Sequence, residues 1–152
     1  MGYPGPSPIS EPEIKATSAY MVSFKHNLRM YLSVHTYGNY VLYPYGFDFD
    51  VYIKNWKEHL FVAQKWYDAI HAATGQMYDI GNSADLLYTA NGASDDYAAA
   101  YANANLAFTL ELTGGGNNGF DFPQDMIEDL VEETFLGFRQ FGLYIGDNYN
   151  YN

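Results

Sequence analysis

The chain has 152 residues, of which 48% are hydrophobic and 18% aromatic, a composition that suits one globular domain with a sizeable core. Seven Lys and Arg residues against eighteen Asp and Glu give a formal net charge of −11, which argues against binding to a phosphate backbone. Cysteine is absent, so the chain has neither a disulfide scaffold nor a cysteine nucleophile. No apolar run approaches the roughly 18 residues of a membrane span. Neither nucleic acid nor a membrane is therefore expected as a partner.

The first part of the chain is predicted to form a helix and a buried strand. Ser10 and Glu13 have the spacing of a capping box, so a helix is expected over about residues 11–25. The apolar run at residues 28–34 is typical of a buried strand, and it ends directly before His35. A histidine at a strand end is more often satisfied by a hydrogen bond than bound to a metal, so His35 alone is ambiguous.

Helices and strands continue to alternate along the chain. Extended chain at residues 39–43 is followed by a helix at 56–74, which Gly75 ends. The predicted core stripe of this helix is Leu60, Ala63, Tyr67 and Ile70. The other expected elements are a short strand at 77–80, a helix at 94–103, a closing helix at 124–143 and a polar tail at 147–152 that frays. The pattern predicts an α/β fold in one domain over residues 1–152, with a mixed, mostly parallel sheet flanked by helices.

The clearest strand signal is an alternating run that contains one carboxylate. Strict alternation separates two faces, which are Leu106, Phe108 and Leu110 on one side and Ala107, Thr109 and Glu111 on the other. Because burying a lone carboxylate is costly, Glu111 must be paired, solvated at the strand end, or functional. A glycine-rich run follows at residues 113–119, at the kind of position where open α/β sheets place their sites. It is not a phosphate loop, because no Lys or Ser/Thr of a P-loop follows it.

Taken in order, several segments resemble the C-terminal half of the zinc metallocarboxypeptidases of the pancreatic carboxypeptidase A/B type. The matching segments are residues 33–37, 41–46, 88–97, 108–112 and 119–120, with Pro123 and residues 133–137 in the closing helix. They extend from about residue 5 to 145 in one order. The resemblance implies the C-terminal half of the metallocarboxypeptidase fold.

The resemblance also implies a set of roles in peptide hydrolysis. His35 would be one ligand of a zinc ion, and Glu111 would be the general base that takes a proton from the attacking water. The implied substrate-binding residues are Tyr88 for the terminal carboxylate and Thr36, Tyr37 and Phe120 around the scissile bond. Asp95 would pair with a basic C-terminal side chain, the B-type preference, for which Gly46 and Ser83 leave room. Asp95 and Asp96 equally suit the positive end of a helix, so a structural role remains open.

Other parts of the family's site lie in its N-terminal half. They include two zinc ligands in an HxxE motif, and no HxxE spacing occurs in this chain. The resemblance therefore implies a fragment, a nicked product or a truncated gene product. Alone, the chain is expected to bind zinc poorly and to lack activity, and it would need the upstream half as a covalent or associated segment. An exposed sheet edge is expected where that half would continue the sheet.

Three functions are open from the sequence. The leading hypothesis is a secreted B-type zinc carboxypeptidase that removes Lys or Arg from the C-termini of peptides and proteins, with secretion implied by the family alone. The second is a truncated, non-catalytic relative that binds peptide C-termini or has a structural role. The third, an acidic surface protein that binds carbohydrate, explains the Tyr- and Asn-rich composition but not the ordered motifs.

Overall fold

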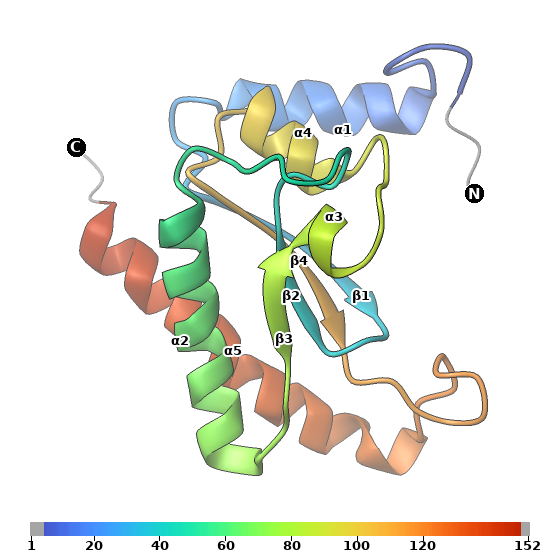
Figure 1. Cartoon of the computed structure of the whole chain (residues 1–152), viewed down its shortest axis with the longest axis vertical. Coiled ribbons are helices and arrows are strands. Elements are labelled where there is room, and N and C mark those ends of the chain that lie inside the picture. Colours follow the sequence, from blue (N-terminus) through green and yellow to red (C-terminus); the bar gives the residue numbers. More distant parts are fainter. Residues whose placement is uncertain (1–4, 150–152) are drawn as a thin grey trace.

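The computed structural model describes residues 5–149 and contains one four-stranded sheet (Figure 1). The strands are β1 (Met30–Thr36), β2 (Tyr40–Tyr43), β3 (Asp79–Asn82) and β4 (Leu106–Leu112). Their order is β1-β4-β2-β3. β1 pairs in parallel with β4 and β2 in parallel with β3, whereas β2 and β4 are antiparallel. The predicted mixed, mostly parallel sheet is confirmed.

Helices cover both faces of this sheet. The helices are α1 (Pro12–Ser23), α2 (Trp56–Thr74), α3 (Ser83–Leu86), α4 (Ser94–Ala100) and α5 (Ile127–Asn148), with a 3₁₀ turn η1 (Gln124–Met126) before the last. α2 and α5 pack side by side on one face, and α4 with α1 lies over the other (Figure 1). The short helix α3 had no signal in the sequence pattern, because one turn is too short for a recognisable period.

β4 connects the two layers, as its alternation predicts. Leu106, Phe108 and Leu110 enter the larger core with α2 and α5, while Ala107 enters the smaller core beneath α4. The rings of Phe108 and Phe141 stack with their centroids 5.1 Å apart and their planes 9° from parallel. The predicted division of the strand into two faces is confirmed.

Several predicted boundaries differ from the structure. β1 extends to Thr36, so His35 lies within the strand rather than after it. α4 ends at Ala100 instead of residue 103, because Asn103 has a positive φ of 55° that a helix cannot continue through. The capping box is wrong, since Ser10 donates its hydroxyl hydrogen bond to the side chain of the adjacent Glu11 instead of to a helical N–H group.

The two long helices also differ from their predicted forms. In α2, Leu60 is exposed while His59 and Trp66 are fully buried, so the predicted stripe is partly wrong. α5 continues to Asn148, past the predicted end at residue 143. The hydroxyls of Tyr144 and Tyr149 both donate to Glu58 of α2, and these hydrogen bonds hold the end of α5 in place. The expected fraying is therefore wrong up to Tyr149, and residues 150–152 lie outside the described part.

A Gly137→Ala substitution is expected to lower the free energy of unfolding by about 1–3 kcal/mol through overpacking. A Cβ atom at Gly137 would overlap the buried indole of Trp66, where α5 packs on α2. Chemical denaturation measures the change. The control is Gly142→Ala in the same helix, whose Cβ would have nothing within 4 Å and which should stabilise the protein because alanine favours helix. Equal effects of the two substitutions would contradict the packing argument.

Candidate active site

The parallel register of β1 and β4 brings together the two residues with the strongest chemical signal. His35 is the direct partner of Glu111 in this register. Paired residues on neighbouring strands point to the same face, and the strands lie about 4.8 Å apart. His35 is exposed and Glu111 is half-buried. An imidazole and a carboxylate therefore lie side by side at the C-terminal ends of two parallel strands.

The surroundings of this pair suit proton transfer. Burial raises the pKa of Glu111 above its ordinary value, and the charge of His35 acts in the opposite direction. A carboxylate with a raised pKa that still reaches solvent can accept a proton at near-neutral pH. The hydroxyl oxygen of Ser33 lies 2.8 Å from Nε2 of His35. If Nε2 carries the ring proton, this contact leaves the lone pair of Nδ1 free for a metal.

His35 has the chemistry of a zinc ligand. Zinc in peptidases is bound by neutral imidazole nitrogens and carboxylate oxygens, with one position left open. Within residues 5–149, no three His, Asp or Glu side chains converge into a metal-binding group. Among the residues singled out in the sequence, His35 is the one that fits zinc, with Glu111 next to it as a base.

Two aromatic rings form a wall beside the strand ends: Tyr37 directly follows β1, and Phe120 lies in the segment after β4. Their ring centroids are 4.9 Å apart at 81°, and both rings are exposed. Thr36, also exposed, is joined to Tyr37 by a cis peptide bond. Gly119 has a φ of 84°, and a Cβ atom there would overlap the Tyr37 ring. The glycine-rich run thus lets the backbone approach Tyr37 closely, a role that the sequence pattern did not predict.

Tyr88 lies on the surface. Its side chain is 67% exposed and makes no hydrogen bond to the residues that the structure describes. The segment that carries it is attached to the loop after β2, because the N–H of Ala90 donates to the carbonyl of Gly46 at 2.7 Å. The structure therefore connects the Tyr88 segment to Gly46.

Three residues are predicted to form the specificity pocket, namely Gly46, Ser83 and Asp95. A Cβ atom on Gly46 would lie 3.4 Å from the Cβ of Ser83, so these two positions are adjacent. Asp95 is only 2% exposed. Burial raises the pKa of Asp95, while the neighbouring Thr109 hydroxyl and the charge of His35 act in the opposite direction. Asp95 of α4 is thus buried next to Thr109 of β4.

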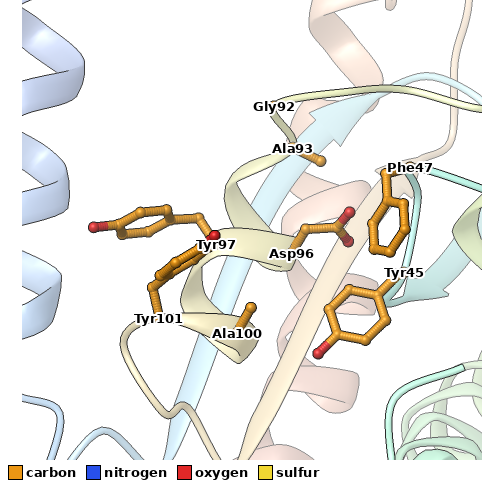
Figure 2. Close-up of a pocket in the computed structure, with 8 residues that line it drawn as sticks. All are labelled: Tyr45, Phe47, Gly92, Ala93, Asp96, Tyr97, Ala100 and Tyr101. Atoms are coloured by element: carbon orange, nitrogen blue, oxygen red, sulfur yellow. The ribbon is translucent and has the colours of Figure 1, made fainter. Parts of the chain in front are cut away.

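Asp96, not Asp95, is the acid that contacts Gly46. The Gly46 N–H donates to both Asp96 carboxylate oxygens, at 2.9 and 3.0 Å. Burial raises the pKa of Asp96 to about 6, partly opposed by this N–H. Asp96 also lines a cavity of about 490 Å³ whose walls include the rings of Tyr45, Phe47, Tyr97 and Tyr101 (Figure 2). The sequence pattern indicated only a helix start at Asp96 and contained no signal for this cavity.

The sheet, the His35–Glu111 pair and the aromatic wall together fit a metal-dependent hydrolase. A family profile described as zinc carboxypeptidase matches residues 2–137, and the chain therefore belongs to the zinc carboxypeptidase family.

Among curated relatives, the chain is 34% identical to carboxypeptidase B of Astacus astacus over 148 residues, which cover 97% of this chain and 48% of that protein. It is 38% identical to carboxypeptidase O of Bos taurus over 130 residues, covering 86% of this chain and 34% of that protein. The chain thus spans half or less of the length of these relatives.

Solved structures agree with the family assignment. Bovine thrombin-activatable fibrinolysis inhibitor, in complex with tick carboxypeptidase inhibitor, superimposes with a TM-score of 0.86 at 27% identity over 96% of this chain and 49% of that one. Carboxypeptidase A of Helicoverpa armigera gives a TM-score of 0.83 at 26% identity, over 95% of this chain and 36% of that one. Among residues 5–149, none of the helices combines the length and the hydrophobicity needed to cross a bilayer.

Proposed function

We propose that this chain forms one side of the active site of a zinc carboxypeptidase that releases Lys or Arg from peptide C-termini. The observation that carries the proposal is the register pairing of His35 with Glu111 at the ends of two parallel strands. The similarity to a carboxypeptidase B supports the preference for basic residues.

Each residue of the pair has a separate task. Zinc, when bound, polarises the scissile carbonyl and makes water more acidic. His35 contributes one imidazole nitrogen toward the metal, and Ser33 orients the ring. Glu111 accepts a proton from the attacking water and delivers it to the leaving amine, since its raised pKa makes both transfers feasible.

Three groups of residues hold the substrate. Thr36, Tyr37 and Phe120 line the path of the peptide beside the scissile bond, where their exposure leaves them accessible. Tyr88 donates its hydroxyl to the terminal carboxylate. Asp95 pairs with the basic side chain, and the small residues Gly46 and Ser83 leave space for it. An apolar C-terminal residue would leave the buried Asp95 carboxylate without a partner, which is the physical basis of the selectivity.

The proposed partner of this chain is the upstream half of the family fold, as a covalent or associated segment. In the described structure β1 is an edge strand with β4 on one side, and its Val34 side chain is exposed. An edge of this kind is a template for another strand. The upstream half would add that strand and supply the remaining zinc ligands. By family, the site of action is extracellular.

One feature of the sequence favours a second candidate, a non-catalytic relative that binds peptide C-termini. The chain contains no HxxE spacing, and that motif provides two zinc ligands in the family it resembles. The binding residues could then act without chemistry.

Coexpression of the chain with the upstream half of the Astacus astacus carboxypeptidase B tests the proposal. Hydrolysis of peptides that end in Arg is expected to exceed that of peptides ending in Phe, and a zinc chelator should abolish both. Chelator-insensitive hydrolysis, or none, would reject the proposal. Faster release of Phe would keep the reaction but reject the assignment of Asp95. Micromolar binding of Arg-terminated peptides without hydrolysis would favour the second candidate.

An Asp95→Asn substitution is expected to lower kcat/KM for the Arg-terminated peptide by about 10²–10³-fold, because a buried charge pair loses one partner. The Phe-terminated peptide should be affected far less. The control is Asp125→Asn, which removes the same charge from an exposed position. A similar loss of kcat/KM for both peptides would mean that Asp95 supports the fold and does not recognise the C-terminal side chain.

A further inference from the structure

The cavity beside α4, here called the Asp96 cavity, is lined mostly by aromatic rings. Tyr45 and Phe47 come from the loop after β2, and their ring centroids are 5.3 Å apart. Tyr97 and Tyr101 come from α4 and its C-terminal end, and their rings stack at 5.2 Å and 21°. Figure 2 shows the Asp96 carboxylate turned toward Phe47, with the Tyr97 and Tyr101 side chains on the other side of the α4 ribbon. The cavity measures about 490 Å³, enough for a long side chain.

Asp96 is the single charged group of this lining. Its other lining neighbours are Gly92, Ala93 and Ala100, and no Lys, Arg or His belongs to the described residues of the wall. The Gly46 N–H donates to both carboxylate oxygens, and the charge that acts on the pKa of Asp96 is the like charge of Asp95. Asp96 is thus a partly buried carboxylate that has no cation opposite it within residues 5–149.

A carboxylate framed by aromatic faces is an environment that selects organic cations. The faces of Tyr and Phe rings attract a guanidinium or ammonium group, and guanidinium also stacks on them. The carboxylate then adds a charge-assisted hydrogen bond. A ligand's own terminal carboxylate would find no positive partner among the lining residues, so the cavity favours a side chain from the interior of a polypeptide.

We propose that the Asp96 cavity is a binding site for the guanidinium or alkylammonium group of an internal Arg or Lys side chain of a polypeptide. This site differs from the proposed recognition of a C-terminal residue, which depends on Asp95 and on a free carboxylate. Asp96 supplies the charge, and the aromatic rings of the lining, with Tyr45 and Phe47 on the side of the carboxylate, supply faces for the alkyl stem.

Titration of the 152-residue chain with a peptide blocked at both ends, acetyl-Gly-Gly-Arg-Gly-Gly-amide, tests the proposal. Binding is followed by calorimetry and by shifts of the Ala93 and Ala100 amide signals in NMR spectra. The same peptide with citrulline in place of Arg keeps the shape and removes the charge, and it is expected to bind at least ~10-fold more weakly. This comparison needs no change in the protein.

Variants locate the binding to the cavity. Asp96→Asn should weaken binding of the Arg peptide by ~10-fold or more, while the amide keeps a carbonyl acceptor for the Gly46 N–H. Phe47→Ala removes a ring that is 45% exposed and should weaken binding about 3–10-fold without disturbing the core. Glu132→Gln on the exposed face of α5 is the control for net charge and should leave binding unchanged.

Four results would overturn the proposal, three of which concern the blocked peptides. These three are equal binding of the Arg and citrulline peptides, absence of binding by both, and full retention of binding in Asp96→Asn. An Arg peptide with a free C-terminus that binds ~10-fold more tightly than the blocked one would also contradict it, since recognition would then include a terminal carboxylate. No hydrolysis is measured, so failure here leaves the proposed zinc chemistry untouched.

Discussion

A Glu111→Gln substitution is expected to reduce hydrolysis of an Arg-terminated peptide by about 10²–10⁴-fold when the chain is combined with its upstream half, because the amide cannot accept a proton. The amide has nearly the size of the carboxylate, so the dissociation constant of the peptide should change little. Steady-state kinetics and a separate binding titration measure the two effects. Glu128→Gln, at an exposed position of α5, is the control and should keep full activity.

The pH dependence of kcat/KM is a second test of the role of Glu111. Because burial raises the pKa of Glu111 above 4.5, the ionised base is lost at a higher pH than for an ordinary carboxylate. The acidic limb of kcat/KM should therefore rise with pH through this raised value and reach a plateau above it. Full activity at a pH below 4.5 would contradict the role of Glu111 as the base.

A His59→Phe substitution is expected to lower the free energy of unfolding by about 2–4 kcal/mol, since it leaves buried polar groups without partners. His59 is fully buried in α2. Its Nε2 accepts the N–H of Ala107 at 3.1 Å, and its Nδ1 donates to the carbonyl of Asn55 at 3.1 Å. β2 pairs with β4 only from Thr109 onward, so the imidazole takes the place of a neighbouring strand at Ala107. Urea denaturation measures the loss.

The same histidine should make the protein sensitive to acid. Burial lowers the pKa of His59, while the Asn55 carbonyl and Glu58 act in the opposite direction. The unfolded chain takes up a proton near pH 6.5 and the native chain does not, so the stabilisation is complete above pH 6.5 and declines as the pH falls below it. The urea concentration at the unfolding midpoint should decrease as the pH is lowered from 7.5 to 5.5. His59→Phe should make this decrease smaller. His26→Ala at an exposed position should leave the decrease unchanged.

Local patterns in the sequence predicted those elements whose signal is local. The faces of β4 follow from strict alternation, and α2 has the predicted bounds because its apolar period ends at a glycine. The prediction of the buried face of α2 was partly wrong, because a hydrophobic pattern counts His59 as polar and places it on the exposed face. Its burial depends on a backbone N–H group of β4, far along the chain, which a periodicity cannot reveal.

The candidate site likewise has features that the sequence predicts and features that depend on the fold. The resemblance singled out His35 and Glu111, but their position side by side depends on a parallel register between strands that lie far apart in the sequence. The Asp96 cavity could not be predicted, because its rings come from two separate segments and sixteen tyrosines make any single one uninformative. Burial of Asp95 against β4 likewise requires the position of α4 over the sheet.

The pairing of β1 with β4 also has a consequence for how the protein reaches its native state. These two strands join distant parts of the chain, whereas β2 meets β3 across α2 alone. Closing the longer loop costs more chain entropy, so contacts of this kind generally slow folding. His35 and Glu111 should therefore come together late. In pulse-labelled hydrogen exchange, the amides of the β1–β4 ladder should gain protection after those of α2, and the catalytic surface would exist only once the fold is nearly complete.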